Sequence, residues 1–487
     1  MKLKYFFILI VVSMTCFTVK AAAAFAEQQE RLELSIDDVS QLALNNNFDI
    51  QVYELDRMIS EKELLKAQAV YDTNVDISYK YDEDRLKRSS VLFGERSTAV
   101  SQDAGLSKKL PTGTILSLSA SHDRAATDSP FNTLNPYHES DMNFSITQPL
   151  AKNFLGVIDR NTIKVKKLDI ENAAYTSTDK IEKELADTHK AYWNMLLAYK
   201  DVSITDEILD SAQELYAAQK KNFQIGLVEP PEFYAVEANL KERQRDSIFA
   251  YNKMNKAANL LKLKLNLGRD VIVEPKGVFV LDEIEAAFDD IMIEALKSRR
   301  DYKAAKNDIK AMDLVLQMKK NSLWPEIDIS GTIKKNGLNT KFSESVNEIT
   351  KQDYPEYTVG VTFSFPLENS TAKAEYSQKE LEKAKALINL KKIECSILVE
   401  SHDAFFHAKS MYDSLKLLKD AKELQHKKYL GEEDRFKKGR SDTDRLIRYQ
   451  QDYLRASLMH SQLLYNYQAA LIDLNVTMNR FLQRDKS

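Results

Sequence analysis

A long run without glycine or proline sets the strongest limit on how this chain can fold. Neither residue occurs between Asp159 and Gln224, and apolar side chains recur there at helical spacing, with charged residues between them: Leu185, Tyr192, Leu196, Tyr199, Leu209, Ala212, Tyr216 and Phe223. A helix over this run would extend on the order of 100 Å. Such a helix is too long to fold around one globular core. We therefore expect it to pack lengthwise against neighbouring helices, as a coiled coil or a bundle of hairpins.

The second half of the chain repeats the first. Four phrases recur in the same order: "ALNNNFDI" (43–50) as "ALKSRRDY" (295–302), "VDIS" (75–78) as "IDIS" (327–330), "TQPL" (147–150) as "SFPL" (364–367), and "NFQIG" (222–226) as "RFKKG" (435–439). The separation is 252 residues for the first two pairs, 217 for the third and 213 for the fourth. We therefore expect a tandem duplication, with repeats at 27–268 and 280–487 and 35 extra residues within the strand region of the first. This period is too long for a solenoid unit.

Each repeat is expected to contain the same series of elements. A helix comes first, then strands, then a very long helix and finally a closing helix. In the first repeat these elements are expected at about 36–70, 73–150, 159–225 and 231–267, and in the second at about 285–322, 325–367, 369–437 and 442–483. The chain is therefore predicted to be mainly α-helical with one group of strands in each repeat.

Four of the expected strands alternate between apolar and polar residues. In "YDTNVDISYKYD" (71–82), one face carries Val75, Ile77, Tyr79 and Tyr81, and the other carries polar side chains. The segments 142–147, 324–333 and 357–365 alternate in the same way. Strands of about ten residues with one apolar face and flanking aromatic residues are typical of transmembrane barrels, which we favour here. A soluble antiparallel sheet alternates for the same reason and stays the alternative.

The number of strands in each chain is open between four and six. The segment "LSKKLPTGTILSLSASH" (106–122) predicts two further strands joined by a tight turn at Pro111–Thr112–Gly113. Because Lys108 falls on the same face as Leu106, we favour a hairpin folded within an outer loop. Four strands cannot close a barrel, and lipid does not tolerate an open sheet edge. We therefore expect a barrel shared between chains, for which a trimer would supply twelve strands.

The N-terminus has the features of a secretory signal peptide at residues 1–26. Lys2 and Lys4 precede the apolar run "YFFILIVVSM", and "AFA" (24–26) provides a small-residue cleavage site. After cleavage the formal net charge changes from −4 to −7, because Lys2, Lys4 and Lys20 are lost. This mild acidity argues against a nucleic-acid partner.

The remaining composition excludes several kinds of site. Cys395 would be the sole cysteine of the mature chain, which excludes an intrachain disulfide and a cysteine metal site. The seven histidines show no convincing metal-ligand spacing, and no nucleophile elbow, phosphate loop or dinucleotide glycine pattern occurs. We therefore expect no metal, no cofactor and no enzymatic activity. No segment after the signal is apolar enough to cross a membrane as a helix, so a membrane form must use strands.

The duplicated order of elements resembles the TolC-type outer-membrane efflux protein family. The phrase "LSIDDVSQLALNNNFDI" is similar to the family's opening helix, and "ITQPL" to the end of its first strand region. The phrases "NFQIGLVEPPEFYAVEANL" and "RFKKGRSDTDRLIRYQQDYLRA" are similar to its two helix-hairpin ends. The resemblance covers essentially the whole mature chain. It implies a homotrimer whose shared β-barrel lies in the outer membrane, in contact with lipid, and whose helices form a coiled-coil tunnel through the periplasm.

The resemblance also implies a set of functional residues at the two hairpin ends. In the family, these ends contact an adaptor, and acidic residues just past the second glycine line a closed aperture. The corresponding positions here are Gly226, Glu232, Gly439, Asp442, Asp444, Arg445 and Arg448. The family's acidic positions fall on Arg445 and Arg448, while the acids lie earlier, at Asp442 and Asp444. Two interpretations follow, a ring of carboxylates or ion pairs that hold the hairpin ends together.

The function implied by the resemblance is that of a passive exit duct. Such a channel serves a tripartite efflux or type I secretion system and is recruited by a periplasmic membrane-fusion adaptor and an inner-membrane pump. The alternative is a soluble periplasmic coiled-coil adaptor or tether, which would also explain the signal peptide and the long helices. The sequence identifies neither the exported substrate nor whether the pump is driven by protons or by ATP.

Overall fold

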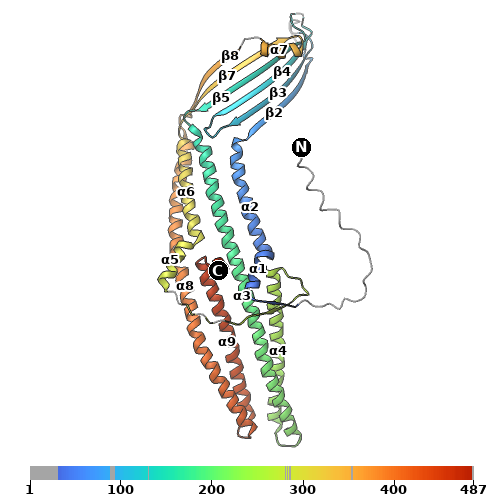
Figure 1. Cartoon of the computed structure of the whole chain (residues 1–487), viewed down its shortest axis with the longest axis vertical. Helices are drawn as coiled ribbons and strands as arrows, with labels where there is room; N and C mark the ends of the chain where they lie inside the picture. The colour runs from blue at the N-terminus through green and yellow to red at the C-terminus, as the bar shows by residue number, and fades with distance from the viewer. Residues whose placement is uncertain are drawn as a thin grey trace, which may run out of the picture. The chain divides into compact units, whose positions relative to one another are not determined.

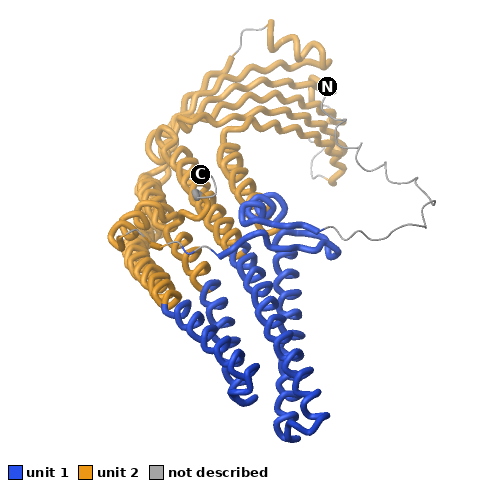
Figure 2. Tube along the Cα trace, turned by 60° about the horizontal axis from the view of Figure 1, so that its bottom comes forward, with its two compact units in different colours: residues 1–47, 188–281, 417–465 blue, residues 48–187, 282–416, 466–487 orange. Residues whose placement is uncertain are grey.

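The computed structural model describes residues 31–87, 94–129, 131–279, 281, 283–284, 287–351 and 355–484 (Figure 1). The expected signal peptide lies outside these residues. The chain divides into two compact units (Figure 2). Unit 1 comprises residues 1–47, 188–281 and 417–465, and unit 2 comprises residues 48–187, 282–416 and 466–487. Three long helices contribute residues to both units, namely α3 (Val157–Gln224), α8 (Ser370–Lys437) and α9 (Thr443–Thr477).

Unit 1 is a helical bundle with a small parallel sheet. Its other elements are β1 (Arg31–Leu34), α1 (Ile36–Asn46), α4 (Pro230–Leu265) and β6 (Ile272–Pro275), and β1 pairs with β6. Helix α1 begins at a capping box, in which Ser35 accepts a hydrogen bond from the Asp38 amide and the Asp38 carboxylate accepts one from the Ser35 amide. A core cluster joins all four long helices of the unit, with side chains from α3 (Ile208, Leu215), α4 (Val236), α8 (Tyr429) and α9 (Leu446, Tyr453, Leu454). The expected lengthwise packing of long helices is therefore present.

Unit 2 contains a six-stranded antiparallel sheet in the order β2-β3-β4-β5-β7-β8 (Figure 1). The strands are β2 (Thr73–Asp84), β3 (Ser97–Lys109), β4 (Ile115–Thr127), β5 (Tyr137–Pro149), β7 (Glu326–Asn339) and β8 (Glu356–Ser364). The remaining elements of the unit are α2 (Phe48–Gln68), η1 (Ala69–Tyr71), η3 (Phe154–Gly156), α5 (Phe288–Ser298), α6 (Arg300–Asn321), α7 (Phe342–Lys351) and α10 (Phe481–Arg484).

The preference for a hairpin folded within an outer loop is wrong, because β3 and β4 are central strands of this sheet. Strand β3 pairs along its whole length with β2 on one side and β4 on the other. Lys108, which weighed against a membrane strand, pairs with Thr73 and Leu116 next to the tight turn between β3 and β4. A lysine at a strand end can extend its ammonium group past the apolar surface into water. A single charged residue at this position is therefore compatible with an apolar sheet face.

The register places apolar residues from all six strands on one face of the sheet. One cross-strand row joins Val75, Leu106, Leu118, Phe144, Ile333 and Tyr357. All six of these side chains are exposed to solvent in the isolated chain. The opposite face carries polar residues, and the row displaced by one residue joins Asn74, Ser107, Ser117, Ser145, Thr332 and Thr358. The alternation read from the sequence is thus a property of the whole sheet.

The helical part of unit 2 has its own core and a buried ion pair. Side chains of α5 (Ile291, Ala295), α8 (Ile397, Phe405) and α9 (Leu474), together with Met478 just past the end of α9, form a cluster. The fully buried carboxylate of Glu182 on α3 pairs with Arg300 at the start of α6. The same carboxylate accepts hydrogen bonds from Asn479 Nδ2 at 3.0 Å and from the Leu482 amide at 3.2 Å.

No helix within the described residues is long and apolar enough to cross a membrane.

Candidate functional site

All seven predicted site residues lie in unit 1, in the turns of two helix hairpins or in the first helical turns that follow them. Helix α3 ends at Gln224 and α4 begins at Pro230, while α8 ends at Lys437 and α9 begins at Thr443. We refer to the turn at residues 225–229 as the first tip and to the turn at residues 438–442 as the second tip.

Gly226 and Gly439 end the two long helices in the same way. Both adopt left-handed backbone conformations, with φ of +78° and +67°, and a Cβ atom at either position would meet nothing within 4 Å. In the first tip, the Leu227 amide donates to the Asn222 carbonyl oxygen at 2.9 Å and the Gly226 amide donates to that of Phe223 at 3.0 Å. The second tip repeats this double-bonded helix end. Glycine is therefore required here for its backbone conformation and not for lack of space.

A pair of stacked aromatic rings connects the two helices of each hairpin behind its tip. In the first hairpin, Phe223 and Phe233 stack with ring centroids 4.7 Å apart and planes only 6° from parallel. In the second, Tyr429 and Tyr453 are nearly parallel, with centroids 5.9 Å apart. Such pairs hold the antiparallel helices together beyond what apolar burial alone provides.

The buried carboxylate of Glu432 organises the second tip. Its side chain is 5% exposed and accepts a short hydrogen bond from Ser441 Oγ. Arg435 Nη1 lies 3.6 Å from this carboxylate, and Arg445 Nη1 lies 3.9 Å from it. Arg445 also reaches Asp442, whose Oδ2 lies 3.5 Å from Nη2 and whose Oδ1 accepts the Arg445 amide hydrogen at 2.8 Å. Arg445 therefore ties the start of α9 to the end of α8.

Asp444 and Arg448 pair with each other on the surface of α9. They are four residues apart, and their side chains are 79% and 65% exposed. The hydrogen bond to Asp444 raises the pKa of the Arg448 guanidinium. Because exposed pairs of this kind add little to stability, these two residues do not connect the helices.

The hydroxyl group of Thr443 links the two hairpins next to their tips. The Thr443 side chain is almost completely buried, at 1% exposure, and its Oγ1 donates to Glu232 Oε1 at 2.5 Å. Gln219 Nε2, from the end of α3, donates to the same Oγ1 at 3.2 Å. Glu232 and Gln219 belong to the first hairpin and Thr443 to the second, so the hydroxyl bridges them.

The sequence prediction missed three of these residues. Glu432, Thr443 and Gln219 carry the contacts within the second tip and between the tips, while Asp444 and Arg448 do not. One feature of the sequence points to the pairing of Glu232 with Thr443: both residues occupy the first helical turn after a tip. Nothing local marks Gln219 or Glu432 among the many polar residues of the long helices.

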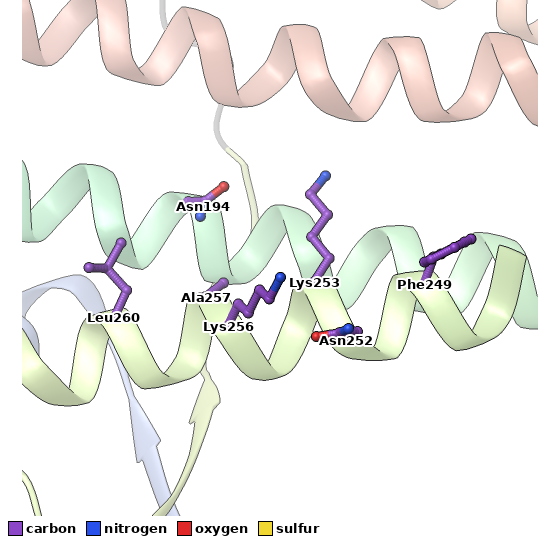
Figure 3. A pocket seen from close by; sticks show the side chains of 7 residues that line it. All are labelled: Asn194, Phe249, Asn252, Lys253, Lys256, Ala257 and Leu260. Atoms are coloured by element: carbon purple, nitrogen blue, oxygen red, sulfur yellow. The ribbon is translucent and has the colours of Figure 1, made fainter.

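A shallow groove of about 340 Å³ runs between α3 and α4 in unit 1 (Figure 3). Its walls carry Asn194 from α3 and, from α4, Phe249, Asn252, Lys253, Lys256, Ala257 and Leu260. Lys253 Nζ pairs with Asp201 Oδ2 at 2.7 Å. The groove contains amines, amides and apolar surface but no carboxylate or imidazole that could act as an acid or base. Across the part of the chain that the structure describes, no three histidine, cysteine, aspartate or glutamate side chains are placed to hold a metal ion.

The chain is similar to a known protein family and to several solved structures. Residues 292–480 match the model of the family described as outer membrane efflux protein. No curated protein sequence matches the chain. The Campylobacter jejuni CmeC outer membrane channel is 15% identical over 91% of this chain and 85% of that chain, with a TM-score of 0.69. The Neisseria gonorrhoeae MtrE outer membrane channel, in its open state, is 15% identical over 93% and 90%, with a TM-score of 0.68.

A third solved structure gives the same result. The Vibrio cholerae outer membrane protein VceC is 11% identical over 91% of this chain and 95% of that chain, with a TM-score of 0.68. The chain therefore shares its fold with these outer membrane channels. Residues 292–480 are thus similar to outer membrane efflux proteins, and the chain as a whole has the fold of the channels CmeC, MtrE and VceC.

Proposed function

We propose that this protein is the outer membrane channel of a tripartite efflux or type I secretion system. It acts as a passive exit duct, with its sheet in the outer membrane and its helices in the periplasm. It catalyses no reaction. A periplasmic membrane-fusion adaptor and an inner-membrane pump recruit it, and the pump selects the cargo.

The sheet of unit 2 is the observation that carries this proposal. Its six strands expose one continuous apolar face, whereas soluble proteins rarely expose contiguous apolar patches larger than a few hundred Å². An apolar face towards lipid and a polar face towards a water-filled lumen are what a transmembrane barrel strand requires. If the protein were a soluble adaptor, this apolar face would be exposed to water.

The two edges of the sheet favour an assembly of several copies. Strands β2 and β8 each have one neighbour among the described residues, so their outer edges present unpaired backbone groups. Lipid cannot satisfy these groups, so the β2 edge of one copy must pair with the β8 edge of another. We propose a ring of three copies, the homotrimer implied by the resemblance. With six strands in each copy, the barrel of this ring would have more strands than the twelve expected from four per chain.

Helices of unit 2 also carry apolar surface that a second copy would cover. On α8, the exposed residues Leu381, Ile388, Val399 and Phe406 follow one another at intervals of seven, eleven and seven, which keeps them on one side of a helix. On α2, Phe48, Val52, Leu55 and Ile59 are exposed at coiled-coil spacing. These stripes support lengthwise packing between copies in the proposed tunnel.

We propose that the tips form the periplasmic aperture and the adaptor contact. The seven predicted residues remain its candidates, and the geometry favours ion pairs over a ring of carboxylates. Arg445 reaches two carboxylates, one of them buried, whereas Asp444 pairs with Arg448 on its own helix. Arg445→Ala is therefore expected to loosen the second tip and raise single-channel conductance in planar bilayers. Asp444→Ala, the matched control, should change conductance much less, and equal effects would contradict the role of Arg445.

The proposed function is tested by purification and electron microscopy. We expect the protein to leave the envelope only with detergent, to form particles with threefold symmetry and to conduct ions in planar bilayers. Release by salt washing as a compact monomer would refute the channel and favour the soluble adaptor.

A further inference from the structure

A hollow of about 600 Å³ lies on the apolar face of the sheet, beside the short helix α7. Ala104 and Ala120, neighbours in the register of β3 and β4, form its floor. Ile77 of β2 and Phe342 and Val346 of α7 also line it. The hollow is deep because the side chains of these two alanines are small. The adjacent row of the same face has the larger Leu106 and Leu118 on the same two strands.

Helix α7 is held firmly against the sheet. Ser345 Oγ and Ser140 Oγ are hydrogen-bonded at 2.9 Å, and both residues are buried. A Cβ atom on Gly337 would lie 2.0 Å from the Ser345 carbonyl oxygen, so only glycine allows this approach. Glu348 accepts hydrogen bonds from the Leu338 amide at 3.0 Å and from Asn339 Nδ2 at 2.9 Å. The apolar wall that α7 provides is therefore a built part of the site.

The hollow lies where the apolar face gives way to polar residues. On the apolar face, the cross-strand row that contains Leu106 and Leu118 is followed by the row that contains Ala104 and Ala120. This order runs along the strands away from the helices that are joined to the sheet. The next rows bring Gln102 with His122, and then Arg124. In the proposed channel this end of the sheet points away from the periplasm. The hollow would then lie where the acyl chains of the outer leaflet meet their head groups.

Two cations flank the hollow on the same face. Arg124 lies two rows beyond Ala120 on β4, and Lys335 pairs in register with Met142, a residue of the hollow. No ion-pair partner for either residue occurs in the described part of the chain. Lys334, on the opposite face, differs in that its Nζ pairs with Asp141 Oδ1 at 3.1 Å. Free guanidinium and ammonium groups beside an apolar cavity are suited to a phosphate group attached to an acyl chain.

We propose that this hollow binds one acyl chain of a bisphosphorylated glycolipid of the outer leaflet, with one phosphate at Arg124 and a second at Lys335, on either side of the contact between α7 and Ser140. The inference rests on the proposed function, since only a sheet in the outer membrane would bring this face into contact with lipid. Apolar walls hold the chain, and the two cations hold the head group.

The test is native mass spectrometry of the detergent-purified protein with lipid A as the probe. Wild-type protein is expected to retain lipid A. The variant Ala120→Leu, which fills the hollow, and the double variant Arg124→Gln/Lys335→Gln should each weaken retention at least tenfold. Lys108→Gln is the matched control, because Lys108 is a cation on the same face at the opposite end of β3, and it should retain lipid A as wild type does.

Two further probes identify the ligand. Equal retention of phosphatidylglycerol would overturn the assignment to a glycolipid, and competition by inorganic phosphate alone would overturn the requirement for an acyl chain. Undiminished retention in Ala120→Leu would overturn the site itself. Planar-bilayer conductance of the same samples separates this inference from the proposed function. Conducting protein without bound lipid A refutes only the lipid site, whereas protein that fails to conduct refutes the channel.

Discussion

The Thr443 bridge between the two tips gives the most direct test of how the hairpin ends are held together. Replacing Thr443 with valine removes the hydroxyl group while keeping the shape of the side chain. Glu232 then loses the hydrogen bond that it accepts at 2.5 Å, and Gln219 loses the acceptor that it reaches at 3.2 Å. Because Thr443 is buried, water cannot easily take the place of the missing hydroxyl.

The expected effect follows from the cost of leaving polar groups unpaired. A buried donor or acceptor without a partner costs about 1–3 kcal/mol. Since about 1.4 kcal/mol corresponds to a factor of ten in an equilibrium constant, the open form of the tips should become roughly tenfold more populated, or more. The loss should stay local, because the stacked aromatic rings behind each tip are unchanged.

Hydrogen–deuterium exchange measured by mass spectrometry can detect this opening. Peptides covering the first and second tips should exchange faster in Thr443→Val by the same factor, while peptides from the sheet should not change. Thr443→Ser keeps the hydroxyl and should exchange almost as wild type does. Unchanged exchange at both tips in Thr443→Val would show that the bridge contributes nothing, and the argument would fail.

Three further predictions concern buried charge, backbone conformation and pH. Glu182→Gln leaves the Arg300 guanidinium without its counter-charge, so we expect a loss of about 3–5 kcal/mol, measured by denaturant unfolding in detergent. Gly439→Ala forces a left-handed residue to carry a side chain and should cost about 1–2 kcal/mol, measured by the same unfolding. Burial and nearby lysines lower the pKa of His460 to about 4, so the unfolded chain takes up a proton first as pH falls. The contribution of neutral His460 to thermal stability should therefore be fully present above pH 6.5 and be lost as the pH falls towards 4. His460→Gln should make the stability depend less on pH in this range.

Each of these predictions has a matched control. The double variant Glu182→Leu/Arg300→Met removes both charges and should recover most of the stability that Glu182→Gln loses. Gly431→Ala lies within α8, where an added Cβ meets nothing, and should stabilise the protein slightly. His402→Gln, at an exposed histidine, controls for the replacement of a histidine as such. Opposite results for any pair would contradict the corresponding argument.

The strands of unit 2 illustrate what the sequence reveals and what it conceals. The alternation at Val75, Ile77 and Tyr79 was readable, because a strand places every second side chain on one face. The place of β3 was not, because its pairing depends on two neighbouring strands and not on its own pattern. Lys108 is compatible with an apolar face because the register places it at a strand end, which its own segment does not reveal.

The tips show a different limit. Gly226 and Gly439 were predictable because a helix end with left-handed backbone favours glycine regardless of the rest of the fold. The bridge from Thr443 to Glu232 and Gln219 was not, because it joins hairpins more than 200 residues apart in sequence. The charged residues nearest the second glycine were the predicted site, yet the buried Glu432, outside that set, pairs with Arg445. Contacts between distant segments require the structure.

The unpaired edges of the sheet have a consequence for cells that make both normal and damaged copies. In the proposed ring, every copy offers its β2 edge to one neighbour and its β8 edge to the other. One copy with a defective β8 therefore leaves a gap that two intact copies cannot close. If half of the copies were defective and association were random, only about one ring in eight would be sound. Mutations in an edge strand should accordingly be dominant, whereas those that merely prevent a copy from folding should be recessive.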